Sequence, residues 1–394
     1  MKKVTVVGVG MGPDTITQEG LRAVRQADAL IGAPRLLSLF AGGGKPAFAE
    51  YLPEPVAKAV RESDCRSFAV LVSGDTGFYS AAEGLCAALA EYELTLIPGV
   101  SSLSCFFARL KRPWQEAALV SCHGRTSNLA DTVRRSRLTF VLTGGNMAQL
   151  AQTLSNAGFG YLRVQAGENL GAENERLWTC RADELEKAGA ALTILLIENP
   201  AWDDRVRFGI PDEEFLRGGV PMTKEEVRAV TMSRLSPRPE AVCWDIGAGT
   251  GSVTVELALA AYRGQVYAVD KNEEALHLIR ANCRAFHIGN VTPVLGDAPS
   301  MLDVLPPPDT AFIGGSGGRL REILAALLHR NPHVRVAVNA IALESTYEAL
   351  SAFAENGLTA EAVQISAARC KSVGSLHLLM AQNPVFVISG GRNG

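Results

Sequence analysis

The strongest chemical signal in the chain is a glycine loop framed by acids. The apolar run 242–246 leads into the loop residues Gly247, Ala248, Gly249, Thr250 and Gly251. Glycines there let a ligand approach the backbone closely, and the helix expected at 253–261 offers unpaired N–H groups. A second apolar run ends at Asp270, where a carboxylate can accept hydrogen bonds from both ribose hydroxyls. These elements predict the nucleoside-binding half of a doubly wound sheet.

The acid at the start of the loop indicates which nucleoside is bound. Nicotinamide enzymes usually show G-x-G-x-x-G, whereas this loop reads D-I-G-A-G-T-G and begins at Asp245. The loop has no positive charge for a pyrophosphate, and Asp245 suits a cationic ligand such as S-adenosylmethionine. The pattern resembles motif I of the class I methyltransferases, which implies that Asp297, just before Ala298, faces the adenine amino group. A tight turn without a ligand and a nicotinamide oxidoreductase remain the alternatives.

In the first half of the chain, one predicted strand after another ends in small, hydrogen-bonding residues. The run 4–9 leads into a glycine loop, and Thr17 is expected to cap a helix over 18–26. Loops at the carboxyl ends of parallel strands are where open α/β sheets bind ligands. The candidate residues in these loops are Pro13, Gly74, Asp75, Ser101, Ser102, His123 and Thr143.

These blocks, in this order, resemble the tetrapyrrole methylase family over roughly residues 1–200. The shared blocks are the glycine-proline loop 8–13, S-G-D at 73–75, P-G-V-S-S at 98–102 and G-E-N-L-G at 167–171. The resemblance implies two α/β subdomains that bind S-adenosylmethionine between them. The C-H-G-R block at 122–125 points to the subgroup that methylates C-5 of the precorrin ring, with His123 reaching the tetrapyrrole. The opening loop departs slightly from the commoner G-x-G-P-G.

A polar, proline-containing break at 199–205 predicts a linker after the apolar run 192–197. We therefore expect one domain over 1–203 and a second over 206–394. Near the start of the second, Thr223 with Glu226 three residues later forms a capping box pattern. Capping alone and a contact with the ligand both remain open for Thr223.

The second half, from about 208 to 390, resembles the class I precorrin methyltransferases. The shared segments are M-T-K-E-E-V-R, the glycine-loop block, F-I-G-G-S-G-G at 312–318 and V-N-A-I-A-L-E at 338–344. The resemblance implies a Rossmann-like domain, a contact between Thr223 and the methionine part of the cofactor, and methylation at C-15 with loss of a carboxyl group.

The substrate implied by these resemblances carries many carboxylates. The glycine-rich stretch 314–318 could form an anion-binding nest that includes Gly315 and Ser316, with Arg319 beside it. A flexible turn before the helix expected at 320–328 is the alternative. Asn339 and Glu344 follow a strand whose end should face the same crevice, although Glu344 could equally be a solvated acid at a helix start. We identify no catalytic acid or base, because the electron-rich ring supplies the nucleophile.

Composition excludes several other classes of function. A net charge of −3 without a long basic run argues against nucleic acid as a partner. The eight cysteines are widely spaced, with no Cys/His group at zinc spacing, so we expect free thiols, no metal and a cytoplasmic protein. The longest apolar stretch, 188–197, is too short to cross a bilayer.

Two methyltransferase signatures in one chain, in this order, predict a bifunctional enzyme of cobalamin synthesis. The resemblance implies methylation of precorrin-6B at C-5 and C-15, with decarboxylation of the C-12 acetate to give precorrin-8. We expect one S-adenosylmethionine in each domain and a homo-oligomer. A cobalt-containing substrate, another porphyrinoid, or one domain that only binds the tetrapyrrole remain open.

Overall fold

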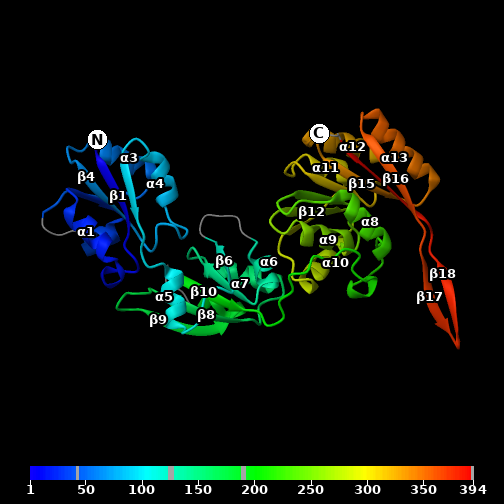
Figure 1. The fold of residues 1–394 in the computed structure, drawn as a ribbon. Coiled ribbons are helices and arrows are strands. Elements are labelled where there is room, and N and C mark those ends of the chain that lie inside the picture. The colour runs from blue at the N-terminus through cyan, green and yellow to red at the C-terminus, as the bar shows by residue number, and fades with distance from the viewer. Residues whose placement is uncertain (41–43, 123–127, 188–191, 392–394) are drawn as a thin grey trace. The chain divides into compact units, whose positions relative to one another are not determined.

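The computed structural model describes residues 1–40, 44–122, 128–187 and 192–391. They form two compact units (Figure 1). Unit 1 comprises the described residues of 1–125, 137–150 and 162–199, and unit 2 comprises those of 126–136, 151–161 and 200–394. Two short segments of the first half therefore group with unit 2, so the expected boundary at 203 and 206 stays a prediction. Among the described residues, no helix has both the length and the apolar character needed to cross a bilayer.

The first sheet of unit 1 is entirely parallel. In spatial order its strands are β3 (Ala47–Phe48), β2 (Ala29–Gly32), β4 (Ser67–Val72), β1 (Lys3–Gly8) and β5 (Glu93–Ile97). The helical elements of this part are η1 (Pro13–Thr15), α1 (Gln18–Gln26), α2 (Pro34–Phe40), α3 (Pro53–Glu62) and α4 (Ala82–Ala88). Thr17 caps α1 as predicted, because its hydroxyl accepts the N–H of Gly20 at 3.0 Å.

The second sheet of unit 1 is mixed. In spatial order its strands are β6 (Ala117–Ser121), β7 (Leu138–Leu142), β10 (Thr193–Glu198), β8 (Arg163–Glu168) and β9 (Arg176–Arg181). The neighbouring helical elements are α5 (Ser102–Arg109), α6 (Leu129–Arg135), α7 (Met147–Asn156) and η2 (Ala182–Lys187). Phe106 and Phe107 of α5 pack on Phe140 of β7, so a three-ring cluster joins helix and sheet. The predicted pair of α/β subdomains is confirmed.

Unit 2 has one seven-stranded sheet. Its strands, in spatial order, are β13 (Val291–Leu295), β12 (Gln265–Asp270), β11 (Val242–Ile246), β14 (Thr310–Ile313), β15 (Arg335–Ala340), β19 (Val385–Gly391) and β16 (Thr359–Ile365). The first five run parallel, and β19 is antiparallel to both of its neighbours. The helical elements are η3 (Asp212–Glu214), α8 (Glu225–Leu235), α9 (Ser252–Ala260), α10 (Glu273–Ala285), α11 (Ala298–Leu302), α12 (Leu320–Arg330) and α13 (Leu343–Glu355).

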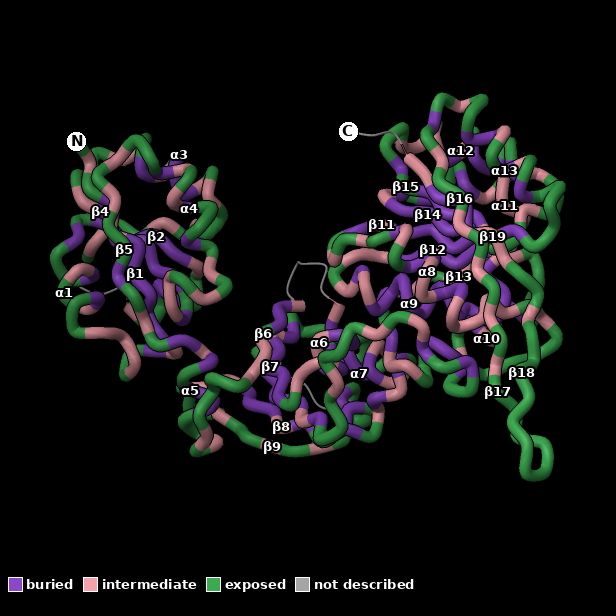
Figure 2. The backbone as a smooth tube through the Cα atoms, turned by 45° about the vertical axis from the view of Figure 1, so that its right-hand side comes forward, coloured by how far each residue is buried: buried purple, intermediate pink, exposed green. Residues whose placement is uncertain are grey.

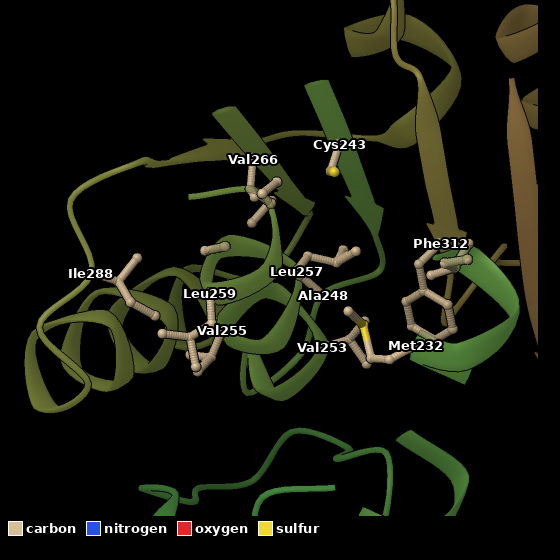
Figure 3. Packing of buried hydrophobic residues seen from close by; sticks show 14 of the residues in the cluster. Met232, Cys243, Ala248, Val253, Val255, Leu257, Leu259, Val266, Ile288 and Phe312 are labelled. Carbon is tan, nitrogen blue, oxygen red and sulfur yellow. The ribbon is translucent and has the colours of Figure 1, made fainter. Parts of the chain in front are cut away.

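The core of unit 2 lies on both faces of its sheet. Cys243, Val266 and Phe312 face one apolar cluster with residues of α8 and α9, which Figure 3 shows from close by. Their strand neighbours Trp244 and Ile313 face a second cluster with α12 and α13. Successive strand residues point to opposite faces, so strands buried on both sides read as continuous apolar runs. The Rossmann-like class predicted from those runs is confirmed.

A two-stranded hairpin, β17 (Ala368–Val373) and β18 (Leu376–Ala381), leaves the sheet of unit 2 between β16 and β19. Figure 1 shows it extending from these strands as a separate ribbon, and Figure 2 shows its tube coloured as exposed. Its exposed apolar residues include Leu379, whose relative exposure is 75%. The sequence analysis did not predict this element.

Candidate cofactor and substrate sites

The glycine loop of unit 2 borders a cavity of about 700 Å³ at the carboxyl ends of the parallel strands. Gly247 and Gly249 both adopt positive φ, at 70° and 55°. A Cβ on Gly247 would lie 2.7 Å from the backbone of Gly315, and one on Gly249 would lie 2.5 Å from the carbonyl oxygen of Pro221. The loop therefore needs glycine for conformation and for close packing against two other loops.

The carboxylate of Asp270 fixes the glycine loop. Its Oδ2 accepts the N–H of Gly249 at 2.9 Å, and its Oδ1 accepts the N–H of Asn272 at 2.9 Å. Each carboxylate oxygen has a second lone pair, and Asp270 lines the cavity. The side chain can thus hold the loop and still accept the two hydroxyls of a ribose.

The structure does not bring Asp245 to the cavity wall. Its side chain is fully buried under the loop and accepts a short hydrogen bond from the hydroxyl of Thr254. Burial raises the pKa of Asp245 to about 7, and the nearby charge of Asp270 also raises it. Because the carboxylate faces the interior, the expected contact with a cationic ligand stays a prediction. The described cavity wall also lacks Thr250 and Gly251, whereas Gly247, Ala248 and Gly249 belong to it.

Thr223 lines the cavity, but it does not cap the following helix. Helix α8 begins at Glu225, and Lys224 in the N-cap position makes no side-chain cap. Glu226, the other half of the expected capping box, instead binds Arg369 at 2.9 Å. That ion pair lowers the pKa of Glu226. The capping prediction is wrong, because a partner far along the chain takes the carboxylate, and Thr223 is left to face the cavity.

Arg228, which the sequence analysis missed, holds the segment that carries Thr223. Its side chain is 0% exposed and pairs with Glu256 at 2.8 Å and with Asp212 at 3.1 Å. The guanidinium also donates to the carbonyl oxygens of Thr223 and Ile210. A buried charge with this many partners positions one wall of the cavity. Little in the sequence indicates this role, because Arg228 follows Glu225 and Glu226 in the first turn and looks like an ordinary helix residue.

Several other predicted contact residues line the same cavity. Asp297, Ala298, Gly315, Ser316 and Asn339 all line the cavity. Glu344 is exposed and is not part of the described wall, so the alternative of a solvated acid at a helix start is the one that the structure favours.

The expected anion-binding nest is smaller than the sequence suggested. The N–H groups of Gly314 and Gly315 already donate to the carbonyl oxygen of Ile246, at 2.9 and 3.4 Å. The positive φ angles of Gly317 and Gly318, 59° and 81°, show that the loop needs its last two glycines. Only the end of the loop is therefore available to an anion.

Asn339 presents an unused donor beside the cavity. Its Oδ1 accepts the hydroxyl of Thr231 at 3.2 Å, while its buried Nδ2 has no hydrogen-bond partner among the described residues. An unpaired buried donor is costly in a folded protein. Its place on the cavity wall is best explained by a ligand acceptor, which fits the predicted substrate contact.

Unit 1 has its own cavity, of about 730 Å³, with walls from both of its sheets. Three glycines meet backbone to backbone beside it. A Cβ on Gly99 would lie 2.3 Å from the carbonyl oxygen of Gly74 and 2.5 Å from that of Gly8. Gly74 and Gly10 form an isolated bridge in the same place. No larger residue fits at Gly99 without displacing backbone.

A carboxylate also fixes these loops. Asp75 Oδ1 accepts the N–H of Gly77 at 2.8 Å, and its Oδ2 accepts the N–H of Gly99 at 3.1 Å. The pattern repeats that of Asp270, with one local and one distant N–H for each acid. Asp75 lines the cavity together with Gly74, Ser102 and Thr143.

Three other residues predicted for the site of unit 1 are not among the described residues that line the cavity. Ser101 caps α5 by accepting the N–H of Ser104 at 3.1 Å, and Pro13 begins η1; neither belongs to the described cavity wall. Their expected contacts with the cofactor stay predictions. His123 lies outside the described residues. Tyr79 and Asn169, which the sequence analysis missed, line the cavity with positive φ of 48° and 49°, a conformation that marks functional loops.

Comparison with known proteins gives matches to both halves. The family of tetrapyrrole (corrin/porphyrin) methylases matches residues 3–186, and the precorrin methyltransferase domain matches residues 213–390. A Sinorhizobium protein named precorrin-6Y C(5,15)-methyltransferase [decarboxylating] is 32% identical over 95% of this chain and 92% of its own.

Two further relatives match the second half. A Pyrobaculum calidifontis protein named probable cobalt-precorrin-6B C(15)-methyltransferase (decarboxylating) is 44% identical over 46% of this chain and 94% of its own. A crystal structure of precorrin-6y C5,15-methyltransferase from Geobacter metallireducens GS-15 shares 37% identity over 47% of this chain and 97% of that one, with a TM-score of 0.45.

Proposed function

The chain belongs to the family of decarboxylating precorrin-6Y C(5,15)-methyltransferases, and we propose that it methylates C-5 and C-15 of precorrin-6B and decarboxylates the C-12 acetate to give precorrin-8. The N-terminal domain (1–203) performs the C-5 step, and the C-terminal domain (206–394) performs the C-15 step with loss of carbon dioxide. The observation that supports this division best is the repeated site: each unit has a cavity beside glycine loops that one carboxylate fixes.

Each unit binds its own S-adenosylmethionine. The cavities, about 700 and 730 Å³, have the size that small-molecule sites commonly have. In unit 2, Asp270 accepts the ribose hydroxyls, Asp297 accepts the adenine amino group, and Thr223 contacts the methionine part. In unit 1, Asp75, Ser102 and Thr143 serve the corresponding cofactor.

The protein's chemical task is to position the reactants. Bound S-adenosylmethionine supplies an electrophilic methyl group, and the electron-rich tetrapyrrole carbon attacks it in line. The reacting atoms must be held roughly 3–3.5 Å apart. Asn339 and the end of the 314–318 loop orient the tetrapyrrole in unit 2. When the acetate carbon–carbon bond breaks, its electron pair enters the conjugated ring, and a proton then replaces the lost carboxyl group.

The chain forms a homo-oligomer through the β17–β18 hairpin. A lone two-stranded hairpin is marginally stable in water, yet this one exposes five large apolar side chains: Val373, Leu376, Leu378, Leu379 and Met380. A second copy that packs against the faces of the hairpin would cover them. Sedimentation velocity should give an oligomer for the wild type and a monomer for a Leu376→Asp/Leu379→Asp variant. A monomeric wild type would contradict the proposal.

Mass spectrometry tests the function directly. The full chain is incubated with metal-free precorrin-6B and S-adenosylmethionine that carries a labelled methyl group. We expect two labelled methyl groups to be gained and one carbon dioxide to be lost. At a limiting concentration of S-adenosylmethionine, Asp75→Asn should slow the C-5 methylation alone, and Asp270→Asn should slow the C-15 methylation alone.

The remaining outcomes separate the alternatives. One methyl gained with the carboxyl lost would mean that unit 1 only binds this tetrapyrrole. No reaction with the metal-free substrate, but turnover of its cobalt complex, would overturn the metal-free assignment. No reaction with either would require another porphyrinoid.

A further inference from the structure

An ion pair spans the wall of the unit 2 cavity. The guanidinium of Arg319 contacts the carboxylate of Asp297, and the two side chains are 40% and 42% exposed. Both residues line the cavity. Because Asp297 is the proposed acceptor for the adenine amino group, the arginine and the cofactor compete for the same carboxylate.

Arg319 has room to leave this position. It follows Gly317 and Gly318, and a Cβ on either glycine would find no atom within 4 Å. Arg319 is also the N-cap residue of α12, where it makes no side-chain cap. A partly exposed ion pair is weak, so a ligand that offers Asp297 a new partner can displace the guanidinium.

A released Arg319 guanidinium would be available to a carboxylate of a bound ligand. The cationic residues on the described cavity wall are Lys224, Lys271 and Arg319. Lys224 is engaged by Asp212 at 3.6 Å. Arg319 directly follows the glycine-rich loop in the chain, and it lines the cavity together with Asn339. Its planar guanidinium suits a carboxylate better than an ammonium group does.

We propose that Arg319 changes partner during the reaction: it holds Asp297 in the cofactor-free chain and, once the cofactor takes Asp297, binds a carboxylate of the tetrapyrrole. The inference rests on the proposed function for the identity of that polycarboxylate. Cofactor and substrate then bind with positive coupling, since the first frees the group that the second needs. Thermodynamic linkage requires the cofactor and the substrate to raise each other's binding affinity by the same factor.

The first experiment needs no tetrapyrrole. S-adenosylhomocysteine is titrated calorimetrically into the full-length wild type and Arg319→Gln, and the site of unit 2 is identified with Asp270→Asn. Removal of the competing guanidinium should tighten binding in unit 2 by about 2- to 5-fold, the strength of an exposed ion pair. Arg321→Gln is the matched control, because Arg321 lies on the same helix and pairs with Glu355 at 3.0 Å.

If Arg319 only supports the fold, its removal should not tighten the binding of S-adenosylhomocysteine. If Arg319→Gln binds S-adenosylhomocysteine as weakly as the wild type or more weakly, the exchange of partners is wrong. Arg321→Gln should leave the affinity unchanged, and a gain there would also overturn the interpretation.

The second experiment measures the tetrapyrrole. For the C-15 step, Arg319→Gln should raise the KM for precorrin-6B at least 10-fold with little change in kcat, while the C-5 step stays unchanged. S-adenosylhomocysteine should tighten precorrin binding in the wild type and not in the variant. An unchanged KM and retained coupling would refute the inference, even with an active wild type. A wild type inactive on precorrin-6B would refute the proposed function, while the first experiment still decides the exchange at Asp297.

Discussion

The two cavities have similar loop-fixing acids but different further supports. In both, one aspartate accepts two backbone N–H groups and fixes the loops, at Asp75 in unit 1 and at Asp270 in unit 2. Unit 1 adds backbone-to-backbone contact at Gly99, whereas unit 2 adds the buried ion cluster of Arg228. The position of a loop can thus be determined by steric fit or by charge. Substitutions in the two units should therefore destabilise their loops in different ways.

The two units differ in which interactions contribute to the stability of their loops. Contact between glycines costs no desolvation, so unit 1 depends on the absence of side chains. The cluster in unit 2 removes a guanidinium and two carboxylates from water, and it stabilises the fold only while every partner is present. In a bifunctional chain, the reaction of one unit serves as an internal control for changes in the other.

Loss of Arg228 should have the largest effect. In Arg228→Met, Glu256 and Asp212 remain buried without their main counter-charge. We expect unit 2 to lose about 3–5 kcal/mol of unfolding free energy. Calorimetric unfolding should show an earlier transition for unit 2, with C-15 methylation lost and C-5 methylation retained.

The matched control is Arg234→Ala on the same helix. Arg234 pairs with Glu361 at 2.7 Å on the surface, and such pairs contribute below about 1 kcal/mol. Equal destabilisation by the two variants would show that the buried cluster is not what distinguishes unit 2.

The second prediction concerns the pH dependence of unit 2. Burial raises the pKa of Asp245 to about 7 in the folded chain, from its ordinary value of 3.8. The folded state therefore keeps a proton that the unfolded state releases, and stability falls as pH rises from 4 to 7. Between pH 5 and 8 the wild type should lose about 2–3 kcal/mol relative to Asp245→Asn. Urea unfolding at four pH values in this interval measures it, and parallel curves would contradict the prediction.

The third prediction compares the two loop-fixing acids. Asp75→Asn and Asp270→Asn each replace one acceptor oxygen with a donor, so one backbone N–H loses its partner. Each should weaken S-adenosylhomocysteine binding about 10- to 100-fold in its own unit, or about 1.4–2.8 kcal/mol. Equilibrium dialysis at micromolar ligand should fall from two molecules bound per chain to one. A loss of both sites from one substitution would contradict independent cavities.

The smallest expected effect comes from a hydrogen bond inside unit 1. The hydroxyl of Tyr79 donates to the carbonyl oxygen of Leu119 at 3.3 Å in an exposed position. Tyr79→Phe should cost below about 1 kcal/mol and raise the KM of the C-5 step no more than a few-fold. Steady-state kinetics of both steps check this, and a large loss would place the hydroxyl on the tetrapyrrole.

Local patterns predicted the strands and their loops well. The runs 242–246 and 291–295 are strands with those bounds, and helix α1 begins and ends where its cap and periodicity indicated. The loops at the strand ends do surround the cavities, because parallel strands present their carboxyl ends at one edge of the sheet.

The same local patterns could not predict pairs between residues that lie far apart in the sequence. Glu226 had the spacing of a capping box, yet its partner is Arg369, 143 residues later. Arg228 looked like an ordinary helix residue, since its partner Glu256 belongs to another helix. Asp245 carried the right residue type beside the right loop, but its burial depends on Thr254 and on the layers above it. The positions of these side chains depend on contacts with residues far away in the sequence.

The assignment of one cavity to each unit has a consequence for the time course of the reaction. Under the proposed division of the two steps, a tetrapyrrole methylated in one cavity has to bind in the other before the second methyl group can be added. With a large excess of substrate over enzyme, the released singly methylated intermediate competes with fresh substrate for the second cavity. The doubly methylated product should therefore appear after a lag, and unlabelled intermediate added during a labelled reaction should dilute the label in the final product.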